Sequence, residues 1–108
     1  MATFEDFMKL EIRVGTVIDV KDFPEARKPA YKLKIDFGKY GIKKSSAQVT
    51  KLYSKEDLLG RQVVAVTNFP PKQIADFKSE VLVLGFVLNG EVVLLKPERQ
   101  VPNGCRVS

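Results

Sequence analysis

The sequence predicts an all-β domain that forms a small antiparallel barrel with two short helices. Two observations carry this prediction: segments of strand length that are apolar or alternate in hydrophobicity follow one another, and turn residues such as glycine, proline and asparagine separate them. A third observation is the length, since 108 residues with 44% hydrophobic side chains supply one modest core. We therefore expect one domain over residues 1–108.

The N-terminal half predicts one helix and three strands. Thr3 can cap a helix within residues 1–10. Residues 12–20 alternate as the first strand, in which Gly15 predicts a bend or a close backbone approach. One face of this strand is expected to carry Ile12, Val14, Thr16, Ile18 and Val20. Residues 31–37 and 42–49 are the second and third strands. The inward side chains of the second are expected to be Tyr31, Leu33, Ile35 and Phe37.

The C-terminal half predicts a short helix, two further strands and an extension. Ser54 and Gly60 bound a single helical turn. Strands are expected at residues 61–68 and 81–88, with a proline-containing loop between them. Asn89-Gly90 is typical of a type I′ hairpin turn and begins an extension over residues 89–108. This order fits an OB-fold, a five-stranded antiparallel barrel with a short helix between strands three and four.

Composition indicates a binding protein rather than an enzyme. The chain has no histidine, the commonest general base and metal ligand, and no glycine-rich phosphate-binding loop. We therefore predict no catalytic residue, no metal and no cofactor. The acidic N-terminus and the lack of a long apolar run predict a cytoplasmic protein that does not insert into membranes. The single cysteine, Cys105, fits a reducing compartment and is expected to be structural or incidental.

Positive charge is concentrated in one segment. Residues 27–44 hold seven basic residues and one acidic residue, whereas the rest of the chain holds eleven basic and twelve acidic residues. The second and third strands lie in this segment and form the usual ligand face of an OB-fold. We predict a basic face for RNA or another acidic partner, formed by Arg27, Lys28, Lys32, Lys34, Tyr40, Lys43 and Lys44. The alternative is a solvated face whose lysines keep strand edges from pairing.

The stretch NFPPKQIADFKSE, residues 68–80, combines rigidity with a mixture of apolar and basic side chains. Two prolines fix their φ angles and remove two amide donors, so the loop is ordered before it binds anything. Such a loop suits a groove for extended polypeptide. The predicted peptide-binding residues are Phe69, Pro70, Pro71, Lys72, Gln73, Ile74 and Phe77. The alternative is that its aromatic side chains only close one end of the barrel.

Residues 81–88 and 92–95 carry apolar side chains on both alternating faces. A barrel buries one face of a strand, so another element has to cover the second face. The N-terminal helix of the same chain could do so. We favour a twofold partner, and therefore a homodimer to which the terminal segments contribute.

Four segments of the sequence resemble the tRNA-binding domain family: DFMKLEIRVGTV, FPEARKPAYKLKIDFG, EDLLGRQVVAVTNFPPKQI and KSEVLVLG. The nearest resemblance within this OB-fold family is to its stand-alone bacterial CsaA group, over essentially the whole chain. The resemblance implies an OB barrel, a homodimer held partly by residues 1–10 and 89–108, and no catalysis. It also implies a chaperone that binds unfolded or precursor polypeptides without ATP of its own and cooperates with the translocation ATPase SecA in protein export.

The same resemblance leaves a second hypothesis, a tRNA-binding protein that selects RNA by its structure. It implies that Asn68, Ser79 and Glu80 occupy the family's binding-site positions. The chain departs from the family at two places. Phe69 replaces the usual leucine after Asn68, and Glu80-Val81 replaces the common glycine and methionine after Ser79. The chaperone and tRNA hypotheses could also hold together on overlapping surfaces.

Overall fold

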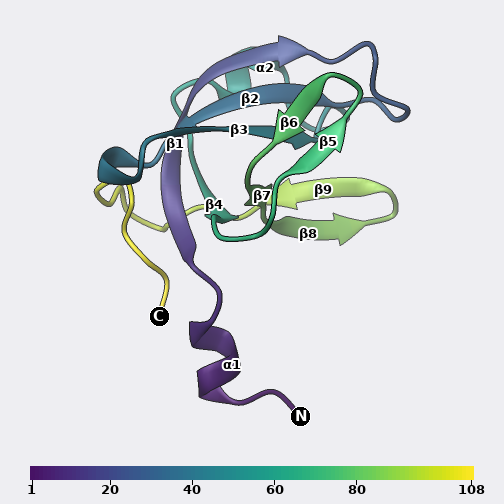
Figure 1. The fold of residues 1–108 in the computed structure, drawn as a ribbon. Coiled ribbons are helices and arrows are strands. Elements are labelled where there is room, and N and C mark those ends of the chain that lie inside the picture. The colour runs from purple at the N-terminus through teal and green to yellow at the C-terminus, as the bar shows by residue number, and fades with distance from the viewer.

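The computed structural model describes all 108 residues, and its centre is a five-stranded antiparallel sheet that curls into a nearly closed barrel (Figure 1). The sheet order is β3-β2-β1-β4-β7. These strands are β1 (Ile12–Asp22), β2 (Tyr31–Asp36), β3 (Ile42–Ala47), β4 (Gln62–Val66) and β7 (Leu82–Val83). The predicted OB-fold is confirmed.

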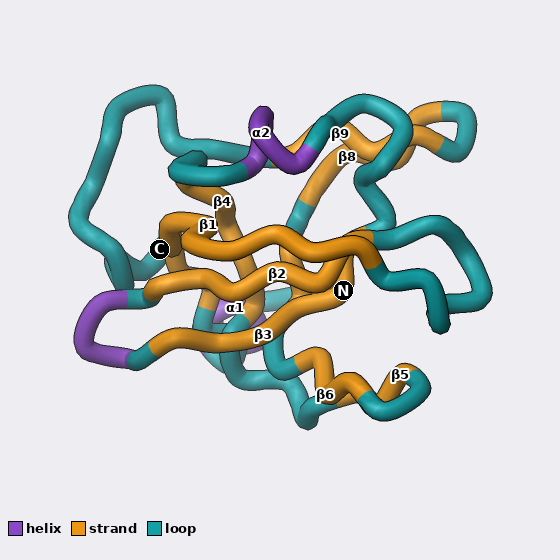
Figure 2. Tube along the Cα trace, turned by 90° about the horizontal axis from the view of Figure 1, so that it is seen from above, coloured by secondary structure: helices purple, strands orange, loops and turns teal.

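Two hairpins lie outside the barrel sheet. One pairs β5 (Lys72–Ile74) with β6 (Phe77–Ser79), and the other pairs β8 (Gly85–Leu88) with β9 (Glu91–Leu94). Figures 1 and 2 show both hairpins at the same end of the barrel as the loop of residues 23–30. The expected loop at 69–80 is therefore wrong, because residues 72–79 form a hairpin. The expected single strand at 81–88 is also wrong, because the chain leaves the barrel after β7 and continues as β8.

Both α-helices begin with a reciprocal side-chain cap. At α1 (Phe4–Met8) the Thr3 hydroxyl accepts from the Asp6 amide at 3.1 Å, and the Asp6 carboxylate accepts from the Thr3 amide at 3.0 Å. Ser54 and Asp57 repeat this arrangement at α2 (Lys55–Leu58), which lies between β3 and β4 as predicted. A short 3-10 helix, η1 (Gly38–Tyr40), connects β2 to β3. No helix of the structure reaches the length and apolarity of a membrane span.

The core confirms the predicted alternation of β2 and corrects that of β1. Tyr31, Leu33, Ile35 and Phe37 are all buried. In β1 Val17 is fully buried and Ile18 is 42% exposed, and the register shift between Val17 and Asp19 turns Val20 toward the same core as Val17. The expectation that Ile12 to Val20 share one face is therefore wrong beyond this irregularity.

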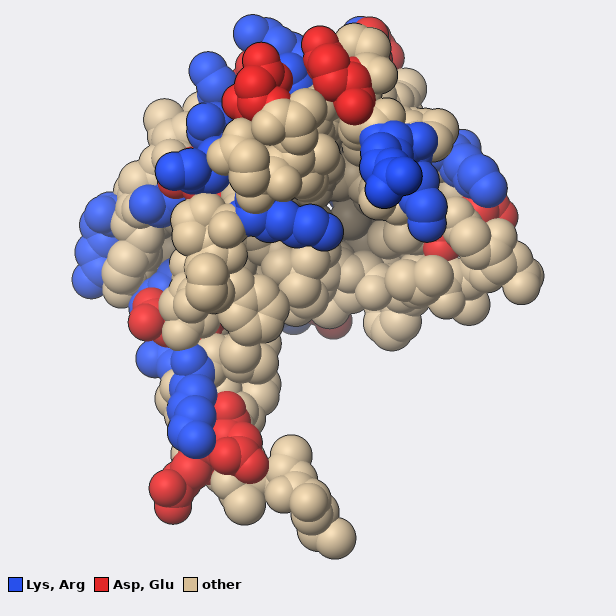
Figure 3. Space-filling model, turned by 45° about the vertical axis from the view of Figure 1, so that its right-hand side comes forward, with Lys and Arg blue, Asp and Glu red and all other residues tan.

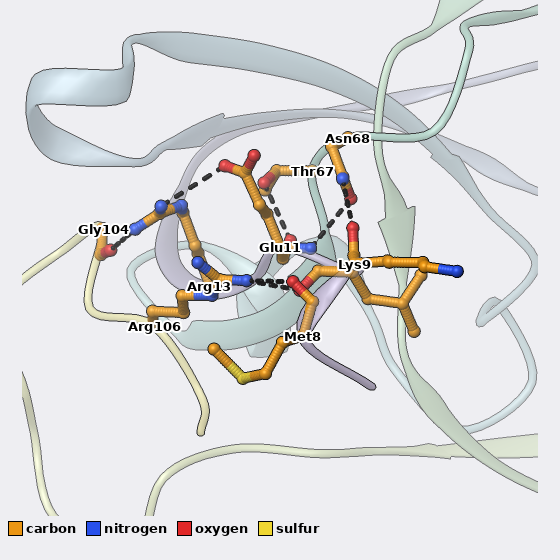
Figure 4. A network of polar contacts seen from close by, with 9 residues as sticks. Met8, Lys9, Glu11, Arg13, Thr67, Asn68, Gly104 and Arg106 are labelled. Atoms are coloured by element: carbon orange, nitrogen blue, oxygen red, sulfur yellow. Dashed lines mark hydrogen bonds and ion pairs between the residues drawn. The ribbon is translucent and has the colours of Figure 1, made fainter. Parts of the chain in front are cut away.

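The C-terminal segment runs along the N-terminal half of β1. The Val14 amide donates to the Cys105 carbonyl at 3.0 Å, the Gly104 amide to the Val14 carbonyl at 2.8 Å, and the Val107 amide to the Ile12 carbonyl at 2.7 Å. Two arginines hold the same segment in place (Figure 4). The buried Arg13 donates to the Gly104 carbonyl, and Arg106 donates to the carbonyls of Met8 and Leu10. The extension therefore completes the chain's own sheet.

Candidate functional site

The β5–β6 hairpin is the element around which the predicted peptide-binding residues are arranged. Pro70 and Pro71 lie before β5, and Ile74 pairs with Phe77 across the turn. Ala75 in this turn adopts a left-handed φ of 52°. The hairpin separates the predicted set, because β5 faces two clefts whereas Phe77 lies on the basic sheet face. Phe69, Pro70 and Pro71 are exposed and line neither cleft.

An apolar cleft of about 400 Å³ lies between the end of β3, the β5 strand, β7 and the β8–β9 hairpin. Its apolar lining includes Ile74, Val81, Val83, Val87, Val92 and Leu94. Lys72 and Ser79 add polar atoms to the same lining. The cleft can therefore bury an apolar side chain while a charged group stays close to it.

A second cleft, of about 460 Å³, lies between β5 and the loop of residues 23–30. Its charged lining residues are Arg27, Lys28 and Lys72, opposed by Glu25. The two clefts share Ser46, Gln48, Lys72 and Ile74, so β5 forms a common wall between them. Figure 3 shows this end of the molecule hollowed, with basic side chains on both sides of the opening.

The basic sheet face is made by lysines of β2 and β3 together with two phenylalanines. The rings of Phe23 and Phe77 meet edge to face, with 5.3 Å between their centroids. The Lys32 ammonium lies 4.8 Å from the Phe23 centroid and 5.6 Å from the Phe77 centroid. The Lys44 ammonium lies 5.4 Å from the Phe77 centroid. Phe77 thus packs as a half-buried partner of these lysines.

Lys34 and Lys44 are directly opposite each other in the β2–β3 ladder. Like charges in this position repel, whereas Asp19, opposite Lys34 in the β1–β2 ladder, attracts it. Lys43 is paired instead with Ile35, whose side chain is fully buried. Since paired residues share a face of the sheet, Lys43 points to the opposite side from Lys34 and Lys44. The structure therefore does not place all the predicted lysines on one surface.

Tyr40 lies away from these lysines, against the C-terminal segment. The Arg13 guanidinium is 3.8 Å from its ring centroid, and the Lys39 ammonium is 5.3 Å away. One face of the ring is already covered by the close arginine. Tyr40 thus offers less stacking surface than its sequence position predicts.

The three family positions make internal contacts. Asn68 donates to the Lys9 carbonyl at 2.7 Å and accepts from the Glu11 amide at 2.8 Å (Figure 4). The Ser79 hydroxyl accepts from the Ser46 amide at 3.0 Å, and a Glu80 carboxylate oxygen accepts from the Lys44 amide at 3.0 Å. These side chains position the N-terminal segment and the edge of β3.

Sequence reasoning missed Phe23 and Arg13. Phe23 is buried, and its ring lies under the Lys32 ammonium. In the sequence, only Pro24 indicated that the loop around Phe23 is fixed. Arg13 occupies a polar position of an alternating strand, which indicates exposure, yet it is buried against the C-terminal segment. Only the position of that segment explains its burial.

The two shifted pKa values belong to surface groups outside the clefts. A hydrogen bond from Lys55 to Asp22, 2.9 Å long, raises the pKa of the lysine. Hydrogen bonds from the Ser54 amide and hydroxyl lower the pKa of Asp57. Neither residue lines the two clefts. The clefts themselves offer apolar surface, amides and ammonium groups, which are groups for binding.

Two solved structures of CsaA proteins are similar to this chain over its whole length. CsaA from Bacillus anthracis str. Ames, described as a chaperone, is 60% identical with a TM-score of 0.95, over 100% of this chain and 99% of that one. The CsaA chaperone protein from Picrophilus torridus is 53% identical with a TM-score of 0.94, over 100% of both chains. The resemblance to the CsaA group is thereby confirmed.

Comparison by sequence finds the same module inside larger enzymes. The methionine–tRNA ligase of Thermococcus onnurineus is 41% identical over 104 residues, which are 96% of this chain and 14% of that protein. The chain therefore spans about a seventh of the length of such relatives. The family model described as "Putative tRNA binding domain" matches residues 12–106. The chain belongs to this tRNA-binding domain family, and its whole length is similar to the CsaA chaperones.

Proposed function

We propose that the protein is a chaperone without catalytic activity that binds unfolded or precursor polypeptides in the clefts around β5. The observation that carries the proposal is the shared wall of the two clefts, one mostly apolar and one polar with three basic residues. An extended chain lying across this wall would place apolar side chains in the first cleft and acidic groups near Arg27, Lys28 and Lys72. The similarity to CsaA chaperones supports the same conclusion.

The first experiment measures fluorescence anisotropy of a labelled, reduced and alkylated polypeptide at low and near-physiological salt. Bulk tRNA serves as competitor. Burial of apolar surface is not screened by ions, so cleft binding should persist at the higher salt and resist tRNA. Binding that disappears with salt, or that tRNA displaces in a stoichiometric manner, would contradict the proposal.

A substitution in the common wall tests the position of the site. Ile74→Ser removes apolar surface from a half-exposed side chain of the hairpin, and we expect polypeptide affinity to fall about fivefold. Leu59→Ser is the matched control, because Leu59 is 57% exposed and lines neither cleft. Equal loss in both variants would argue against the cleft.

Binding of tRNA on the basic sheet face is the second candidate function. The observation in its favour is the Lys34–Lys44 pair, which places two ammonium groups side by side where a phosphate can approach both. The family model and the methionine–tRNA ligases support this candidate. The basic face and the clefts lie on different sides of the β5–β6 hairpin, so both functions are compatible.

We also propose a homodimer that buries an apolar groove of about 890 Å³. The groove lies beneath the barrel, between β1, β4, the β8–β9 hairpin and the C-terminal segment. Ile12, Val14, Val64, Leu84, Phe86 and Val107 belong to its lining. Phe7 and Leu10 of the N-terminal segment pack against Ile12, Val64 and Val66, yet Phe86 remains 62% exposed. The N-terminal segment therefore covers only part of the second apolar face.

Contact with SecA and a cytoplasmic role in export remain predictions from the resemblance. A pull-down experiment with purified SecA would check the contact.

A further inference from the structure

The edge of β3 that faces away from β2 is closed at one end by side chains. The Lys44 amide donates to a Glu80 carboxylate oxygen, and the Glu80 amide donates back to the Lys44 carbonyl at 2.8 Å. The Ser46 amide donates to the Ser79 hydroxyl. Alternate residues of this edge are therefore satisfied by Ser79 of β6 and by Glu80, which follows it, although β3 and β6 form no ladder.

The same edge is open at the next alternate position. Gln48 directly follows Ala47, the last residue of β3, and amides two residues apart on extended backbone point to the same side, so we place the Gln48 amide in the row begun by Lys44 and Ser46. Gln48 is exposed and its amide makes no hydrogen bond. Gln48 also lines both clefts, so this free donor lies at the point where they meet.

The barrel has no hydrogen-bonded ladder on this side. β3 and β7 are the two outer strands of the sheet and lie near each other without pairing. The Leu84 amide donates to the Val64 carbonyl, so by alternation the backbone groups of Val83 point away from β4. The apolar cleft is lined by both strands and therefore occupies the gap between them.

We infer that an extended segment of the bound polypeptide adds as a strand to the open end of β3, pairing with the Gln48 amide. The inference rests on the proposed polypeptide-binding function and specifies its ligand as an extended backbone. Side chains of an added strand alternate, so every second one faces the apolar cleft and the others face outward. Backbone pairing explains how one site accepts many sequences, because every residue except proline offers the same donor and acceptor.

The test compares two peptides of identical side chains, one unmodified and one N-methylated at its three central amides. Only alternate peptide amides face β3, and Gln48 is its one open position, so methylation should remove one backbone hydrogen bond, to the free Gln48 carbonyl, and weaken binding roughly two- to tenfold. Equal affinities would overturn strand addition while leaving polypeptide binding intact. No binding of the unmodified peptide would instead remove the proposed function itself.

A pair of protein variants tests the position of the added strand. Gln48→Pro removes the free amide without breaking an existing hydrogen bond, whereas Gln48→Ala removes the side chain and keeps the amide. We expect the proline variant to bind the unmodified peptide roughly two- to tenfold more weakly and the alanine variant to bind as the natural protein does. Circular dichroism and thermal unfolding establish that both variants fold.

Unchanged affinity in a folded Gln48→Pro variant would overturn the assignment to this edge. Equal loss in both variants would assign the effect to the glutamine side chain and would overturn backbone pairing there. If Gln48→Pro does not fold, the comparison of the two peptides decides the inference alone.

Discussion

At the scale of single residues, Gly15 allows the barrel to close tightly. A Cβ atom at this position would lie 2.6 Å from Ile35 Cγ2 and 2.8 Å from the ring of Phe37. Both neighbours are fully buried and have little room to move. The close backbone approach that the sequence predicted for Gly15 is therefore confirmed, and it is the absence of a side chain that permits it.

Gly15→Ala is expected to destabilise the fold by about 1–3 kcal/mol, because the added methyl group overfills a packed core. Urea unfolding followed by circular dichroism measures the change. The Phe37→Leu background removes part of the clash, so Gly15→Ala should cost less there than in the natural protein. An alanine variant as stable as the natural protein would show that the neighbours move aside.

Asp57 gives the protein a component of stability that depends on pH. Its pKa is lowered in the folded state by the Ser54 amide and hydroxyl, so the carboxylate stabilises the fold above its unfolded-state pKa. This stability is lost as the pH falls through the folded-state pKa. The Asp57→Asn variant should therefore lose less stability than the natural protein between roughly pH 5 and pH 2.

Urea unfolding at a series of pH values measures this difference in slope. Ser54→Ala keeps the backbone donor and removes the hydroxyl, so its slope should lie between the other two. If the natural protein and Asp57→Asn lose stability in parallel, the capping contact does not contribute in the way described.

At the scale of elements, hydrophobic alternation was enough to predict the barrel strands, and Asn89-Gly90 correctly predicted the β8–β9 turn, but the β5–β6 hairpin was missed. Three-residue strands are shorter than a period-2 pattern can identify, and Ala75 at the β5–β6 turn is a residue seldom found at positive φ. The prediction of one strand over residues 81–88 was wrong for another reason. A Cβ at Gly85 would lie 2.8 Å from the Val93 carbonyl oxygen, so the chain leaves the barrel where only glycine fits.

The candidate site was predictable in composition rather than in arrangement. The charge density of residues 27–44 identified the basic segment, but the ladder register decides that Lys34 and Lys44 share a face and that Lys43 does not. That register is set by the η1 connection, which a two-state pattern of apolar and polar residues does not describe. The loop residues were recognised as a group, but the hairpin that separates them was not.

Lys34→Glu tests the basic sheet face as an element. It makes the pair with Lys44 attractive and the pair with Asp19 repulsive, so stability should change little while tRNA affinity falls. Thermal unfolding and filter binding of tRNA measure the two effects. Lys78→Glu has the same charge change on an exposed hairpin position and is the control. An equal loss of tRNA affinity in both variants would indicate that net charge alone matters.

At the scale of the whole molecule, three surfaces can be distinguished, although the apolar cleft and the apolar groove share Leu84 and Leu94. The clefts lie at the hairpin end, the basic face lies on β2 and β3, and the apolar groove lies beneath the barrel. A dimer that buries the groove would still present two copies of the second cleft, which shares no lining residue with the groove. Two sites on one assembly raise the apparent affinity for a long unfolded chain.

Phe86→Glu tests the groove as a dimer surface. A carboxylate in an apolar interface is costly to bury, so the molar mass measured by light scattering should fall from that of a dimer to that of a monomer. Leu52→Glu, at a residue that is 45% exposed and outside the groove, should leave the mass unchanged. A natural protein that is already monomeric would contradict the proposed dimer.

The pairing of the C-terminal segment with β1 determines when folding can finish. The β2–β3 hairpin joins residues close in sequence and can form early, but the N-terminal half of β1 finds its second neighbour only in residues 104–107. Until that stretch leaves the ribosome, Val14 lacks its partners and Arg13 lacks the carbonyl that receives its guanidinium. A nascent chain can therefore assemble most of its barrel during synthesis. It reaches the native state only after translation of the final strand-like segment.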